Sequence, residues 1–146
     1  MGCKILFRKK RNMCSIEDFL TGGPGPHVWD DDLEKYPEGK KYSFESYTYT
    51  CFIKRSDVTA AWCCYIDLPS DHPYNGSQQI VVYCGKPSQS LYDGVNTVNF
   101  NCMNYQDIWP FGCAPYGFDG IPRTYKDYEF AKAETENLAK QLKSLE

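Results

Sequence analysis

The hydrophobic pattern of this chain changes period once, and that change limits the possible folds more than any other feature. From Tyr42 onward, apolar residues recur at every second position, which is typical of half-buried β-strands. The clearest run places Tyr47, Tyr49, Cys51 and Ile53 on one face and Thr48, Thr50, Phe52 and Lys54 on the other. Over residues 125–143 the spacing becomes three and four instead, at Tyr128, Ala131, Thr135, Leu138 and Leu142. That spacing is the apolar stripe of one amphipathic helix, so strands come first and a helix comes last.

The same pattern predicts the remaining elements. Further strands are expected at Thr59–Asp67, which would be an antiparallel partner after a turn at Ser56-Asp57, at Gln79–Cys84 and at Thr97–Cys102. Loops are expected at Asp30–Lys41, Leu68–Gly76, Gly85–Gly94 and Asn104–Arg123. Thr124 with Asp127 resembles a capping box at the start of the helix. We therefore expect an α+β fold, with an antiparallel sheet of about four strands and the C-terminal helix packed on one face. A dimerisation stripe on that helix is the alternative, and it would make the protein a homo-oligomer.

Length and charge set the domain organisation. The chain has 146 residues, enough for one core, and we divide it into an irregular N-terminal arm (1–41) and a single α+β domain (42–146). A net charge of -3 excludes a generic nucleic-acid coat, and the apolar runs are too short to span a bilayer. The basic N-terminus lacks the apolar stretch of a secretory signal, which favours the cytoplasm.

Eight cysteines and a surplus of aromatic residues are the notable features of composition. Five of the cysteines fall in strand-like runs, where cysteine behaves as a small hydrophobic residue. Zinc-binding spacing is absent, so we expect reduced, buried thiols and no metal. Aromatic residues reach 16%, which suits either a ligand surface or the filling of a small β-rich domain.

Recognised catalytic motifs are missing, but polar residues follow three of the predicted strands. They are Asp67, Asp71, His72, Tyr74 and Asn75, then Lys86, Ser88 and Gln89, then Asn104, Tyr105, Gln106 and Asp107. Loops at one end of a sheet can converge into a pocket for a small polar ligand, although the same residue types are common in turns. His72 has two readings: Pro73 can make its imidazole project into such a pocket, or the imidazole can donate to a carbonyl and lock the turn.

Residues 61–143 resemble a family of small uncharacterised proteins of bacteriophages and other mobile elements. The matching motifs are Cys64-Tyr65-Ile66, Pro69, His72-Pro73, Val82-Tyr83-Cys84-Gly85, Phe100-Asn101-Cys102-Met103-Asn104, Asp107 and the helix start at Tyr125–Glu134. Where the family has two histidines and an aspartate, this chain has Tyr83, Asn104 and Asn101. The replacements keep hydrogen-bonding capacity without titratable groups, which favours binding over catalysis.

The functional hypothesis is a phage-encoded, non-enzymatic protein that binds a small polar or nucleotide-type ligand in the host cytoplasm. Such a protein could sequester a nucleotide immune signal of the host. The expected ligand-binding residues are His72, Tyr74, Tyr83, Lys86, Asn104, Tyr105, Asp107 and Arg123, with no catalytic residue, metal or cofactor. Phosphate would be held by Lys54, Arg55, Lys86, Arg123 or Lys126. The alternatives are an inhibitor that binds a host defence protein through its aromatic surface or the acidic segment Asp30–Glu34, and a small nucleotide-acting enzyme.

Overall fold

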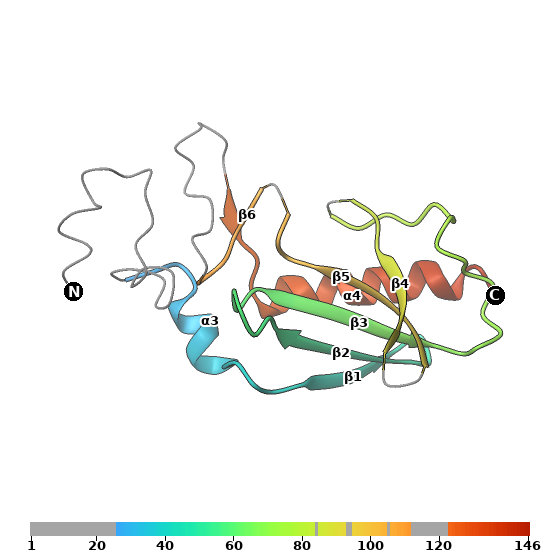
Figure 1. Ribbon diagram of the computed structural model, residues 1–146, viewed down its shortest axis with the longest axis horizontal. Coiled ribbons are helices and arrows are strands. Elements are labelled where there is room, and N and C mark those ends of the chain that lie inside the picture. The colour runs from blue at the N-terminus through green and yellow to red at the C-terminus, as the bar shows by residue number, and fades with distance from the viewer. Residues whose placement is uncertain (1–25, 84, 93–94, 105, 112–122) are drawn as a thin grey trace.

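A five-stranded antiparallel sheet with one long helix forms the body of the molecule, as a computed structural model shows (Figure 1). The structure describes residues 26–83, 85–92, 95–104, 106–111 and 123–146. Its elements are α3 (Asp30–Lys35), β1 (Tyr42–Ser46), β2 (Tyr49–Arg55), β3 (Trp62–Leu68), β4 (Ser88–Tyr92), β5 (Val95–Asn101), β6 (Asp107–Ile108), β7 (Thr124–Tyr125) and α4 (Tyr128–Lys143). The strand order is β1-β2-β3-β5-β4, and β6 and β7 form a separate parallel pair. The α+β class is confirmed, with one strand more than expected.

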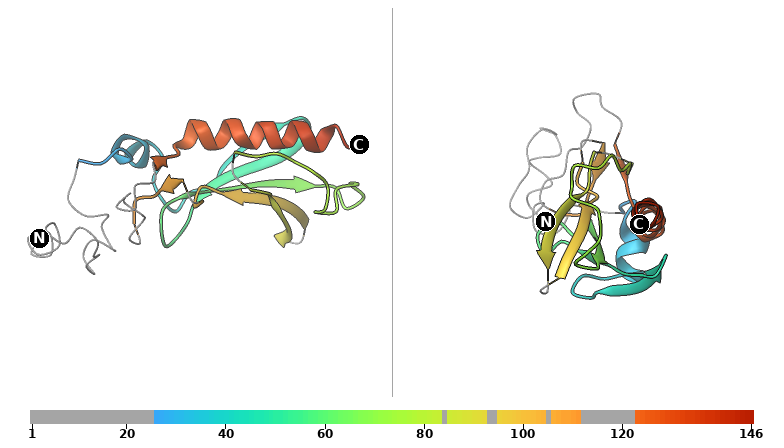
Figure 2. Two further views of the ribbon diagram at one scale, coloured as in Figure 1. Left: turned by 90° about the horizontal axis from the view of Figure 1, so that it is seen from above. Right: turned by 90° about the vertical axis from the view of Figure 1, so that its right-hand side faces the viewer.

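The core lies between the sheet and α4, which runs along one face of it (Figure 2). Leu138 and Leu142 are fully buried there, against inward residues of the central strands such as Ile53 and Ile66. The apolar stripe predicted for the helix is therefore confirmed. The same alternation determines which cysteines lie in the core: Cys64 is buried there, whereas its neighbour Cys63 faces the other side of β3.

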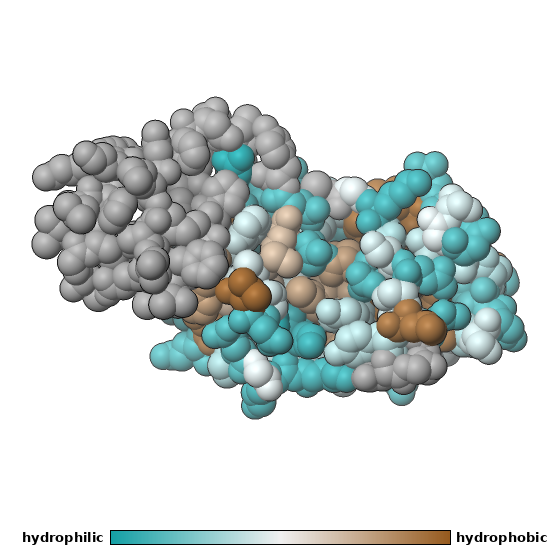
Figure 3. All heavy atoms as spheres, viewed as in Figure 1, coloured by the Kyte–Doolittle hydropathy of each residue, from teal (hydrophilic) through white to brown (hydrophobic). Residues whose placement is uncertain are grey.

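The face of the sheet opposite α4 carries an aromatic cluster of its own. The rings of Phe52 and Tyr65 stack with centroids 4.6 Å apart, and the Tyr92 ring lies 5.3 Å and 5.1 Å from them. Tyr92 belongs to β4, which is separated from β2 by two other strands, so the sheet must curl to bring these rings together. Figure 3, viewed toward this side, shows mostly hydrophilic residues with isolated hydrophobic ones.

The strand predictions were correct for β3 and β5 and wrong at two other places. Residues 79–83 do not form a strand: the backbone of Val81 forms hydrogen bonds with the side chains of Asn137 and Gln141, and that of Tyr83 with the side chain of Glu134, all on α4. The fourth partner in the sheet is instead β4, which lies in the predicted loop Gly85–Gly94. Residues that alternate in burial can thus pair with a helix rather than with a neighbouring strand.

The first predicted strand is in fact a hairpin. Tyr47 and Thr48 have φ of 51° and 73°, and they form the two-residue turn between β1 and β2, whose ends pair at Ser46 and Tyr49. Positive φ at both central positions is the type I′ turn, normally made by Asn and Gly. Tyr47-Thr48 contains neither residue and continues the alternation of apolar and polar residues, so the sequence gives no indication of the turn.

Helix starts also differ from the prediction. The N-cap of α4 is Asp127, whose carboxylate accepts from the backbone N–H of Phe130 at 2.9 Å, while Thr124 belongs to β7. The segment Asp30–Lys41, expected to be a loop, contains the short helix α3, with three acidic residues in its first turn. Carboxylates there are favourable because they face the positive end of the helix dipole.

Candidate functional site

Three of the predicted ligand-binding residues meet beyond the end of β5. The Tyr83 hydroxyl lies 2.9 Å from the Asp107 carboxylate and 2.7 Å from the carbonyl oxygen of Asn101, and it accepts from the Asn104 amide at 2.7 Å. The backbone N–H of Asn104 donates to Asp107 at 2.9 Å. Tyr83 is more than twenty positions from Asn104 and Asp107 in sequence, so their convergence depends on the fold.

This cluster is saturated by its own contacts. Pairing of β6 with β7 places Asp107 opposite Thr124, and Lys126, two residues further on, forms a 2.8 Å ion pair with the fully buried Asp107 carboxylate. Burial, the nearby Cys102 thiol and the Asp107 carboxylate raise the pKa of Tyr83 far above its usual value, which keeps its hydroxyl neutral. The cluster therefore joins the β6–β7 pair to the sheet, and its groups have little capacity left for a ligand.

His72 and Tyr74 lie at the opposite end of the molecule. The His72 Nε2 atom is 3.0 Å from the Leu142 carbonyl oxygen, and Nδ1 accepts from the backbone N–H of Tyr74 at 3.0 Å. With a side chain only 1% exposed, His72 locks its turn against the end of α4. The structural reading of this histidine, left open by the sequence, is the one observed.

The single pocket expected from these residues is not formed. Tyr83 packs its ring on Phe130 with centroids 5.0 Å apart, whereas His72 contacts Leu142. Twelve residues of α4 separate those two contacts, about 18 Å along the helix axis. His72 and Asn104 therefore belong to different ends of the fold.

The other predicted residues are dispersed. Lys86 is exposed between Gly85 and Pro87, and Arg123 directly precedes β7. Tyr105 lies outside the described residues. Neither Lys86 nor Arg123 lines any of the three hollows described below.

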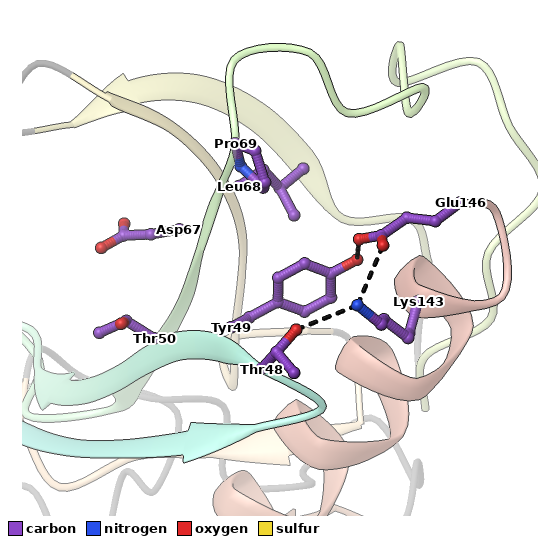
Figure 4. A pocket seen from close by; sticks show the side chains of 8 residues that line it. All are labelled: Thr48, Tyr49, Thr50, Asp67, Leu68, Pro69, Lys143 and Glu146. Atoms are coloured by element: carbon purple, nitrogen blue, oxygen red, sulfur yellow. Dashed lines mark hydrogen bonds and ion pairs between the residues drawn. The ribbon is translucent and has the colours of Figure 1, made fainter.

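One hollow lies beside His72, at the end of the sheet where α4 finishes (Figure 4). It measures about 360 Å³. Two of its charged groups are paired with each other: Lys143 donates to Glu146 at 3.0 Å and to Thr48 at 3.1 Å, and the Tyr49 hydroxyl also donates to Glu146. These hydrogen bonds from Tyr49 and Lys143 hold the pKa of Glu146 below its usual value. The charges of this hollow are thus largely satisfied within the protein.

A second hollow, of about 390 Å³, is bordered by α3 and the start of α4. Its lining is acidic at Asp31, Asp127 and Glu129, and two of these carboxylates already serve the fold. Asp127 caps α4, and Glu129 receives a 3.4 Å hydrogen bond from Tyr36.

The third hollow is basic and lies on the sheet face opposite α4. This lysine hollow, as we call it, measures about 240 Å³ and is lined by Gly39, Lys40, Lys41, Lys54, Arg55, Asp57 and Tyr92. The Nζ atom of Lys41 lies 4.2 Å from the Phe52 ring centroid and 5.6 Å from that of Tyr92, and Nζ of Lys54 lies 5.8 Å from the Tyr92 centroid. Ammonium groups over aromatic faces are a combination suited to an anionic ligand with a planar ring.

The sequence predictions name two residues that line this hollow, but they place the ligand pocket elsewhere, around His72 and Asn104. Lys54 and Arg55 were expected as phosphate partners, whereas Lys40, Lys41 and Tyr92 were missed. Arg55 is not available, because its side chain is fully buried and donates to Tyr36, Ala60, Tyr125 and Asp32. The adjacent lysines at 40 and 41 were the available signal, but their place beside Tyr92 depends on the curl of the sheet.

In the part of the chain that is described, histidines, cysteines and carboxylates form no group of three that could hold a metal ion. None of the helices in that part combines the length and the apolar character needed to cross a membrane. No family model, curated protein or solved structure matches this chain.

Proposed function

We propose that this protein binds a small nucleotide-type ligand in the lysine hollow and releases it chemically unchanged. The observation that carries the proposal is the placement of Lys41 and Lys54 over the rings of Phe52 and Tyr92, on the wall of one hollow. Lysine ammoniums bind phosphate as point charges, and a half-buried tyrosine ring offers a surface for a base.

Charge in the hollow is available for a ligand. Lys40 and Lys54 form no ion pair with any residue in the described ranges, and Arg55 is the lining cation whose charge is neutralised, by Asp32. A ligand phosphate would therefore form charge-assisted hydrogen bonds with Lys40 and Lys54 without breaking an ion pair. Asp57 is the lining acid, so the hollow remains net positive although the chain is net negative.

Size supports a ligand no larger than one nucleotide. Pockets for drug-sized ligands usually measure roughly 300–1,000 Å³, and the lysine hollow is smaller, at about 240 Å³. A single nucleotide would fill it and leave part of itself in solvent. Because the chain resembles phage proteins, we propose that the ligand is a signalling nucleotide of the host, which the protein sequesters.

The test compares nucleotide binding by the wild type and by Lys54→Gln. Calorimetric titration with nucleoside monophosphates should show binding that Lys54→Gln weakens about tenfold, the loss of one charge-assisted contact of about 1.4 kcal/mol. Lys140→Gln removes an exposed charge on α4 and should leave Kd unchanged. Chromatography of the released ligand should return it intact.

Two results would overturn the proposal. Equal Kd values for wild type and Lys54→Gln would place any binding outside the lysine hollow. A chemically altered ligand would make the protein an enzyme.

A further inference from the structure

Asp57 is an acidic residue in a hollow otherwise lined by cations and a tyrosine. It follows β2 in the turn to β3, is exposed, and lines the lysine hollow together with Lys54 and Tyr92. No hydrogen bond or ion pair between residues that the structure describes uses its carboxylate. Because the Asp57 carboxylate is not paired with the lysines of the same hollow, it is available to a ligand.

The turn that carries Asp57 is held firmly. The Ser56 hydroxyl accepts from the backbone N–H groups of Val58 and Thr59, both at 3.2 Å, and the Ser56 N–H donates to the Ala61 carbonyl at 2.8 Å. The buried Arg55 guanidinium fixes the far side of the turn through the Ala60 carbonyl at 2.7 Å. The backbone of Asp57 is thereby positioned in advance, which lowers the entropic cost of using its side chain.

An ionised carboxylate only accepts hydrogen bonds, and it offers two parallel oxygens. Among the common bases, guanine alone presents two adjacent donors on one edge, N1–H and the 2-amino group. In adenine, cytosine and uracil, a hydrogen-bond acceptor lies next to the donor. That acceptor would be repelled by the second oxygen of the carboxylate.

Building on the proposed function, we propose that the lysine hollow selects guanine, with Asp57 accepting from N1–H and the 2-amino group. The base stacks at Tyr92, and the phosphate lies toward Lys40, Lys41 and Lys54. The shared chemistry is a guanine carrying a phosphate, whether as a free mononucleotide or within a single strand.

The experiment titrates wild type and Asp57→Asn with GMP, IMP, AMP and UMP. GMP should bind the wild type about tenfold more tightly than IMP, which lacks the 2-amino group, and more tightly than AMP or UMP. Asp57→Asn should remove the preference for GMP over IMP and leave AMP binding equal or tighter, because a negative charge is lost. Asp71→Asn, an exposed acid in another loop, is the matched control and should keep the preference.

The outcomes separate the two proposals. If all four nucleotides bind equally and Asp57→Asn changes nothing, guanine selection is wrong and the nucleotide-binding function stands. If none binds, the proposed function itself fails. A single-stranded UGU trinucleotide, titrated beside GMP, distinguishes the sources: tighter binding of GMP assigns a free mononucleotide, and tighter binding of the trinucleotide assigns a guanine within a strand.

Discussion

Asp32 connects more parts of the fold than any other side chain in the described ranges. Its carboxylate accepts from the Arg55 guanidinium at 2.9 Å, the Trp62 indole at 3.0 Å and the Tyr128 backbone N–H at 3.1 Å, and also from the Tyr125 hydroxyl. These donors come from two strands of the sheet, from β7 and from α4. One residue of α3 thus fixes the segment before β1 to the rest of the protein.

We expect Asp32→Asn to destabilise the protein by about 3 kcal/mol. The substitution keeps the shape but removes the charge that compensates Arg55, and a buried ion pair that loses one partner typically costs about 3–5 kcal/mol. Urea unfolding measures the change. Asp31→Asn, one residue away and exposed, should alter the free energy of unfolding by less than about 0.5 kcal/mol, and equal effects of both variants would contradict the role given to Asp32.

Sequence could not single out Asp32, because it stands in the acidic run Asp30–Glu34, in which every member has the same local context. The alternative hypothesis from the sequence, an inhibitor of a host protein, uses that run as a partner surface, yet the fold uses one of its carboxylates internally. His72 is a similar case, since its partner Leu142 is seventy residues away. A side chain whose role depends on distant partners is not determined by its neighbours in sequence.

Among the elements, those with strong periodicity were predictable and those held by side-chain contacts were not. α4, β3 and β5 each bury one face against the core, so burial leaves a period in the sequence. Residues 79–83 have the period of a strand but pair with α4, whereas β4 (Ser-Gln-Ser-Leu-Tyr) is an edge strand with little buried surface. The period of the apolar residues shows which side chains are buried. It shows only indirectly which strands pair with each other.

The turn between β1 and β2 supplies a prediction at this scale. Thr48 is β-branched with φ of 73°, a conformation that costs L-residues about 1–2 kcal/mol and glycine little. Thr48→Gly should therefore stabilise the protein by about 1 kcal/mol in urea unfolding, even though the Thr48 hydroxyl contact with Lys143 is lost. Thr50→Gly, in the extended part of β2, should instead destabilise it. A loss of stability in both variants would show that the turn is not strained.

Across the whole molecule, the lysine hollow is assembled from three segments that no local pattern connects. Gly39–Lys41 precedes the sheet, Lys54–Asp57 ends β2, and Tyr92 ends β4. They adjoin because the sheet curls around the stacked rings of Phe52 and Tyr65. The sequence predicts a pocket around His72 and Asn104, with Lys54 and Arg55 among the phosphate partners. It does not predict the lysine hollow, because that hollow depends on the curvature, which is a property of the assembled sheet.

Buried thiols and phenols also give the molecule a common response to alkaline pH. Burial raises the pKa of Cys63 to about 11 and those of Cys51 and Tyr65 to about 12, and it also raises the pKa values of Cys64 and Tyr125. In each case the folded state disfavours the charged form, because the surroundings solvate an anion poorly. Unfolding exposes these groups to water, where thiols ionise near pH 9 and phenols near pH 10.

The sign of the pH dependence follows from linkage. Below pH 9 these groups are neutral in both states and stability is at its full value. Above pH 9 the unfolded chain loses protons that the folded chain retains, so the free energy of unfolding should fall until about pH 12, by up to about 1.4 kcal/mol per pH unit for each group that stays neutral when folded. Urea unfolding at pH 8, 9, 10 and 11 measures the slope. Cys51→Ala should be less stable at pH 8, since it removes a fully buried side-chain atom, but its stability should fall less steeply above pH 9 because one titrating thiol is gone. If the free energy of unfolding fell equally steeply with pH in both proteins, Cys51 would ionise equally readily in the folded and the unfolded state. Its burial in the hydrophobic core with Ile53 should prevent that.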